Sequence, residues 1–126
     1  MKLLRLILTG LIALQHCAFA YVEMIAWADL GPKLFRSFPP EIFGPTTEMA
    51  ANQGLYNLFL VAGLIWALLI KEPTWQRKVA IFFLLCVFVA GAFGALTISA
   101  TVFWVQGLPA LIALALWVAA PADKTT

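Results

Sequence analysis

Four long runs of apolar residues, separated by shorter polar segments, dominate the chain. The runs cover residues 3–27, 52–70, 79–96 and 102–120. The length of each run is similar to that of a helix that crosses the hydrocarbon core of a bilayer, which needs about 20 residues. Their apolar residues are continuous rather than alternating, which argues against a membrane β-barrel. The pattern therefore predicts an all-α fold, an integral membrane four-helix bundle that forms a single transmembrane domain.

The composition removes most other classes of protein. Hydrophobic residues make up 63% of the 126 residues and charged residues only 11%, with a mean hydropathy of +0.97. A soluble domain of this size could not bury so much apolar surface, and a disordered chain would carry far more charge. A net charge of +2 provides no basic surface for nucleic acid. The expected partner is therefore the lipid bilayer.

The distribution of basic residues predicts the orientation of the chain. Because cytoplasmic loops carry the excess of Lys and Arg, we expect both termini and residues 71–78 to be cytoplasmic, and the loop at residues 28–51 to lie outside. Six of the eight basic residues are on the predicted cytoplasmic side, and two are outside: Lys2, Arg5, Lys71, Arg77, Lys78 and Lys124, against Lys33 and Arg36. The tryptophans fall near span ends, as in an interfacial belt: Trp27 and Trp104 outside, and Trp66, Trp75 and Trp117 inside.

Two segments flank or overlap the first span. The loop at residues 28–51 combines four prolines with several large apolar residues, so we expect it to lie on the membrane surface. The first 20 residues resemble a signal peptide that ends in Ala18-Phe19-Ala20. Apolar sequence continues to Trp27, which favours an uncleaved first span over cleavage before Tyr21.

Glu23 is the strongest candidate for a functional residue. The other five acidic residues fall in loops or tails, whereas Glu23 lies about one turn inside the outer end of the first span. An acid at the bilayer centre costs about 2.5–3.5 kcal/mol, so acids within spans usually point inward and serve a function. At about 100° per residue, His16, Glu23 and Trp27 share one stripe of the helix. We expect Glu23 to act as an acid or base and His16 to relay a proton.

The start of the second span carries a cluster of polar residues: Asn52, Gln53, Tyr56 and Asn57. The predicted orientation places them at the depth of Glu23, and two helices joined by one loop should be antiparallel neighbours. We therefore expect the cluster to converge with Glu23 and Trp27 around a small lipophilic ligand, with His16 as the floor of the pocket.

A structural interpretation of the same residues stays open. Asn and Gln often bond across membrane helices, a contribution of about 0.6 kcal/mol on average. Glu23 could pair with Lys33 or Arg36 from the adjoining loop, and His16 could be a neutral, hydrogen-bonded core residue.

The remaining features predict packing rather than chemistry. One His and one acid within the spans are too few for a metal site, and the absence of a phosphate-binding loop leaves no cofactor to predict. Cys17 and Cys86 suit apolar filling. Small residues at 90–95 predict close approach of the third helix to a neighbour first and pairing in a homodimer second. Residues 107–109, Gly-Leu-Pro, should bend the fourth helix.

The segment at residues 50–64, Ala-Ala-Asn-Gln-Gly-Leu-Tyr-Asn-Leu-Phe-Leu-Val-Ala-Gly-Leu, resembles the hallmark of a bacterial family, domain of unknown function 1304. His16, Glu23 and Trp27 follow the arrangement that this family shows, and the resemblance covers nearly the whole chain. It implies a four-span bacterial membrane protein with its first helix retained, and it implies no activity. We expect the protein to lie in the bacterial inner membrane. The residue types of the cluster are also similar to the pocket of emopamil-binding-type sterol isomerases, but those have five spans and share no motif with this chain.

Three functions are compatible with these observations. The first is an outer-leaflet pocket that binds or acts on a small lipophilic ligand, with its status as an enzyme left undecided. The second is an accessory or structural membrane subunit. The third is a proton-coupled small transporter that works as a dimer.

Overall fold

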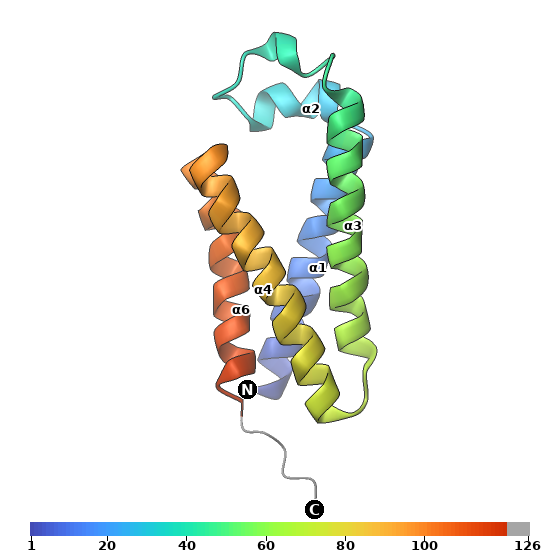
Figure 1. Cartoon of the computed structure of the whole chain (residues 1–126), viewed down its shortest axis with the longest axis vertical. Coiled ribbons are helices and arrows are strands. Elements are labelled where there is room, and N and C mark those ends of the chain that lie inside the picture. Colours follow the sequence, from blue (N-terminus) through green and yellow to red (C-terminus); the bar gives the residue numbers. More distant parts are fainter. Residues whose placement is uncertain (121–126) are drawn as a thin grey trace, which may run out of the picture. The chain divides into compact units, whose positions relative to one another are not determined.

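The computed structural model describes residues 1–120, and within them the chain is helical with no strand. The elements in chain order are α1 (Lys2–Met24), α2 (Trp27–Leu34), η1 (Pro40–Ile42), α3 (Thr47–Leu69), α4 (Pro73–Thr97), α5 (Ala100–Val102), η2 (Phe103–Gly107) and α6 (Leu108–Val118) (Figure 1). Four helical stretches are long and apolar enough to cross a membrane: α1, α3, α4 and the continuous stretch Ala100–Val118. The predicted all-α class with four such helices is confirmed. Lys124, which contributed to the predicted orientation, lies outside the described residues.

The helices fold as two compact units. The four-helix unit contains, of the described residues, 1–13 and 62–120, and so holds parts of all four long helices. The hairpin unit contains residues 14–61, with the remainder of α1, α2, η1 and the start of α3.

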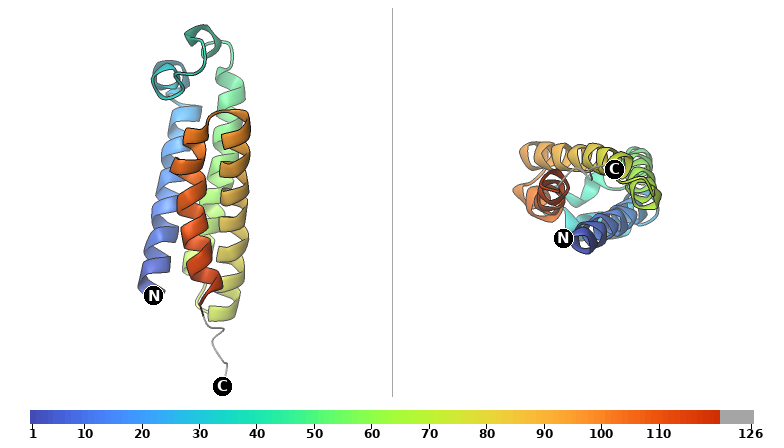
Figure 2. Two further views of the ribbon diagram at one scale, coloured as in Figure 1. Left: turned by 90° about the vertical axis from the view of Figure 1, so that its left-hand side faces the viewer. Right: turned by 90° about the horizontal axis from the view of Figure 1, so that it is seen from below.

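In the four-helix unit, α4 and α6 run side by side as a tight hairpin (Figure 2). A Cβ placed on Gly91 of α4 would lie 2.6 Å from both the Cα and the backbone N of Gly107. A Cβ on Gly94 would lie 2.7 Å from the Cγ1 of Val102. Only glycine allows these backbones to come so close, so the close approach predicted from residues 90–95 is confirmed. The fourth span contains a π-helical turn, η2, directly before the Leu108-Pro109 step.

Trp117 of α6 is a core residue of this unit. Its side chain is only 1% exposed, and its indole Nε1 donates a hydrogen bond of 3.0 Å to Thr9 Oγ1 of α1. The Arg5 guanidinium lies 4.5 Å from the centre of the ring, a cation–π arrangement. Arg77 donates to the Trp117 carbonyl at 3.0 Å and to the Val118 carbonyl at 2.8 Å, which satisfies the end of α6. The expectation that Trp117 belongs to an interfacial belt is therefore wrong, because its indole is buried against a neighbouring helix.

In the hairpin unit, the segment between the two long helices forms a small aromatic core. Trp27 lies 5.1 Å from Phe43 and 5.5 Å from Phe35, measured between ring centres. Phe43 is only 1% exposed, and its ring lies against Gly31, where a Cβ would collide with it. Trp27 Nε1 also donates a hydrogen bond of 2.9 Å to Thr46 Oγ1. The segment expected as an amphiphilic loop is therefore largely folded into α2, η1 and the start of α3.

The helix boundaries differ from the limits of the apolar runs. Helix α1 ends at Met24, because the backbone of Ala26 leaves helical geometry and Trp27 begins α2. Helix α3 begins at Thr47, five residues before the predicted limit, and α4 begins at Pro73, six residues before it. A polar first turn can be helical where its free backbone N–H groups find hydrogen-bond acceptors. In α4 the Glu72 carboxylate accepts from the N–H groups of Thr74 and Trp75.

Candidate functional site

The carboxylate of Glu23 and the side-chain amide of Asn57 join the two long helices of the hairpin unit. Asn57 Nδ2 on α3 donates a hydrogen bond of 2.6 Å to Glu23 Oε2 on α1. Asn57 is buried and Glu23 is half-buried. A hydrogen bond of this length is electrostatically stronger where water is scarce than on an open surface. The predicted meeting of Glu23 with Asn57 is thus observed.

Gly54 brings the two helices close enough for this bond. A Cβ at Gly54 would lie 3.2 Å from both the Ala20 carbonyl oxygen and the Glu23 Cβ, and would collide with the Met24 side chain. Gly54 precedes Asn57 by three residues, so the two share one face of α3. The glycine therefore sets the distance at which the amide reaches the carboxylate.

His16 lies two turns before Glu23 on the same face of α1 and is fully buried. Its ring meets that of Phe19 edge to face, with ring centres 5.2 Å apart. Ala20, also buried, occupies the same face between His16 and Glu23. Along the helix the two candidate groups are about 10 Å apart, a separation that excludes a direct hydrogen bond between them.

In the described part of the chain, the other members of the predicted cluster make no hydrogen bond to Glu23. Asn52, Gln53 and Tyr56 are exposed on α3, and within residues 1–120 none of them bonds to the carboxylate. Tyr56 instead meets Phe59 edge to face at 5.8 Å. Trp27 belongs to α2 rather than to the stripe of the first helix, and its indole bonds to Thr46.

No cation neutralises Glu23 in the described part of the chain. Lys33 and Arg36 are both exposed, and Arg36 Nε donates to the Lys33 carbonyl at 3.3 Å. The alternative in which either residue pairs with Glu23 is therefore not observed. The second carboxylate oxygen, Oε1, makes no hydrogen bond within residues 1–120. Glu23 thus keeps one acceptor available for another molecule.

Sequence reasoning missed three residues that shape this region: Gly54, Thr46 and Phe43. Gly54 lies inside the Asn-Gln-Gly-x-Tyr-Asn run, about one turn before Asn57. Its position there was the sequence signal that could have indicated a close approach of the two helices. Thr46 and Phe43 lie in the segment read as a surface loop, and only the tertiary contacts of Trp27 reveal them.

A metal site is absent from the part of the chain that the structure describes. Within residues 1–120, no group of three or more His, Cys, Asp or Glu side chains could hold an ion. Cys17 and Cys86 are both free thiols.

These features define a class of small membrane proteins, with four candidate spans and one carboxyl–amide pair between the first two. The model of the family described as "Protein of unknown function (DUF1304)" matches residues 10–118, and the chain belongs to this family. The chain is similar to "Uncharacterized protein YpaA" of Lactococcus lactis subsp. lactis, with 27% identity over 116 residues that cover 90% of this chain and 96% of that protein. No solved structure matches.

Proposed function

We propose that Glu23 and Asn57 form a membrane-embedded binding site for a small lipophilic molecule that carries a hydrogen-bond donor. The observation that carries the proposal is the half-buried carboxylate of Glu23, which has one oxygen fixed by Asn57 and the other unbonded within residues 1–120. A carboxylate within a span is costly, and such residues usually serve a ligand, an ion or a proton.

The geometry suits a hydroxyl or amine on an otherwise apolar ligand. Asn57 holds Oε2 and so fixes the carboxyl plane, which leaves Oε1 to accept from the ligand. Gly54 and Ala20 keep the neighbouring surface small, while Met24 adds a flexible apolar wall. Binding energy would come from apolar contact, and selectivity from the hydrogen bond.

The predicted orientation places this site in the outer leaflet of a bacterial inner membrane, with both termini cytoplasmic. The excess of basic residues at the opposite ends of the spans supports that placement. The ligand would then reach Glu23 from the lipid phase.

A structural or accessory role is the second candidate, and one observation favours it. The Glu23–Asn57 bond lies beside Gly54, where the two helices are in close contact, and a clasp between helices would be expected at such a position. A clasp would contribute to stability and leave no ligand to detect.

Native mass spectrometry of protein released from lipid nanodiscs separates the two candidates. The wild type should carry a bound small molecule that Glu23→Gln loses, because Gln keeps the size and the bond to Asn57 but removes the charge. The matched control is Glu48→Gln, which removes an exposed carboxylate from the first turn of α3. Equal ligand occupancy in wild type and Glu23→Gln, or no ligand in either, would contradict the proposal.

A further inference from the structure

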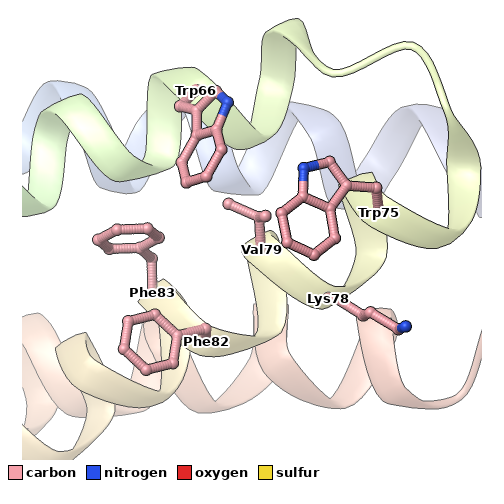
Figure 3. A pocket seen from close by; sticks show the side chains of 6 residues that line it. All are labelled: Trp66, Trp75, Lys78, Val79, Phe82 and Phe83. Atoms are coloured by element: carbon pink, nitrogen blue, oxygen red, sulfur yellow. The ribbon is translucent and has the colours of Figure 1, made fainter.

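A groove on the surface of the four-helix unit is lined largely by aromatic side chains (Figure 3). Its volume is about 270 Å³, and it is lined by Trp66 of α3 and by Trp75, Lys78, Val79, Phe82 and Phe83 of α4. Within it Trp66 meets Trp75 edge to face, with ring centres 6.2 Å apart, and Phe82 meets Phe83 in the same way at 5.3 Å. One ammonium group is thus combined with five apolar side chains.

The groove is built by specific packing between the two helices. The Phe83 ring lies against Gly63 of α3, where a Cβ would collide with it, and Val79 forms a buried floor. Trp66 and Phe82 nevertheless leave 49% and 60% of their surfaces exposed. Aromatic side chains exposed on the outer surface of a membrane-spanning helix contact lipid, so a lipid acyl chain is the molecule that fits against them.

The polarity of the groove matches that of a phospholipid. Helix α4 begins at Pro73, so Lys78 lies in its second turn, and Phe82 follows about 6 Å further along the axis. Figure 3 shows Lys78 and Trp75 at one end of the groove and the two phenylalanines at the other. The ammonium therefore lies at the level of headgroups and the phenyl rings at the level of the acyl chains.

The neighbouring charges leave the Lys78 ammonium available. The Glu72 carboxylate lies within electrostatic reach of it but accepts from the backbone N–H groups of Thr74 and Trp75 at 2.8 and 2.6 Å. The Arg77 guanidinium is committed to carbonyls at the end of α6. The exposed Lys78 can therefore bind an anionic headgroup.

We infer that this groove binds an anionic phospholipid of the surrounding bilayer, with an acyl chain along Trp66 and Phe82 and the phosphate on Lys78. The inference is independent of any ligand at Glu23, because it rests on other residues and on another unit of the chain.

Quenching of tryptophan fluorescence by brominated lipids tests the inference. The full-length protein is placed in phosphatidylcholine vesicles that contain either phosphatidylglycerol or phosphatidylcholine with dibrominated acyl chains. Subtracting the signal of a Trp66→Phe/Trp75→Phe variant isolates the two groove indoles. We expect brominated phosphatidylglycerol to quench them with an apparent binding constant about fivefold higher than that of brominated phosphatidylcholine.

Two exposed lysines of the same segment give a matched pair of variants. Lys78→Gln should bring the ratio of the two binding constants close to one, whereas Lys71→Gln, outside the groove lining, should preserve it. Equal quenching by the two lipids in the wild type would overturn the inference. So would a preference that survives Lys78→Gln, or one that Lys71→Gln abolishes equally, since the latter indicates attraction to surface charge alone.

Discussion

Gly54 sets the distance between the two helices that carry the candidate site, so Gly54→Ala is the most informative structural perturbation. The added methyl would meet the Ala20 carbonyl oxygen and the Glu23 Cβ, both at 3.2 Å, and the Met24 side chain more closely still. Met24 is flexible and can move, but the Ala20 carbonyl is part of the helix backbone and cannot. The helices must therefore separate, which lengthens the Glu23–Asn57 bond.

The expected loss of stability follows from three contributions. Overpacking in a closely packed interface costs about 1–3 kcal/mol. The gain in helix propensity from Gly to Ala offsets about 1 kcal/mol of this, and weakening the interhelical hydrogen bond adds about 0.6 kcal/mol. We expect Gly54→Ala to lower the free energy of unfolding by about 0.6–2.6 kcal/mol.

Equilibrium unfolding in mixed micelles of dodecylmaltoside and SDS, followed by circular dichroism, measures this difference. The matched control is Gly10→Ala in α1, where the added Cβ meets only Leu68 Cδ1, at an ordinary 3.8 Å. The control should be neutral or slightly stabilising, because it gains helix propensity without a clash. A Gly54→Ala protein as stable as the Gly10→Ala protein would refute the reasoning.

Three further predictions concern other contacts. Gly91→Ala should destabilise the chain by about 1–3 kcal/mol in the same unfolding assay, because its Cβ meets the backbone of Gly107 at 2.6 Å; unchanged stability would contradict the close approach. Trp27→Phe should cost about 0.5–1.5 kcal/mol through the lost hydrogen bond to Thr46, and a second substitution, Thr46→Val, should then add less than it does in the wild type. The N–H groups that cap α4 hold the pKa of Glu72 below its usual range. This contribution is complete above the usual carboxyl pKa and is lost as the pH falls through the lowered value. The protection of the first-turn amides of α4 against exchange, relative to their intrinsic exchange rates at each pH, should therefore fall in acid for the wild type but not for Glu72→Gln. Equal pH dependence of the two protection factors would contradict the cap.

The architecture was largely readable from hydrophobicity, because lipid requires each span to satisfy its own backbone hydrogen bonds. The four helices and the close approach at Gly91 follow from runs of apolar and small residues. The polar first turns of α3 and α4 carry no apolar signal, so their beginnings depend on capping contacts that only the fold supplies. Trp117 shows the same limit, since a tryptophan near a span end is compatible with the interface or with the core.

The part of the candidate site that could be predicted consists of polar side chains inside apolar spans, where burial of a polar group is energetically unfavourable. Glu23 and Asn57 stand out in apolar sequence, and they meet. The prediction that Trp27 shares a helix face with Glu23 was wrong, because helical periodicity assumes a continuous helix and α1 ends at Met24. Periodicity places Asn52 and Asn57 on different faces of α3 but does not say which face meets α1, and in the structure Asn57 is buried while Asn52 is exposed.

The central claim is that Glu23, held by Asn57, offers a carboxyl oxygen to apolar molecules that approach from the membrane. Labelling with dicyclohexylcarbodiimide, a small apolar reagent that modifies carboxyl groups, tests this directly in protein reconstituted into vesicles. Peptide mass mapping should show modification of Glu23 in the folded protein, at a rate well above that of the exposed Glu48. If Glu23 reacts only after unfolding, its carboxyl group is closed to such molecules and the claim is contradicted.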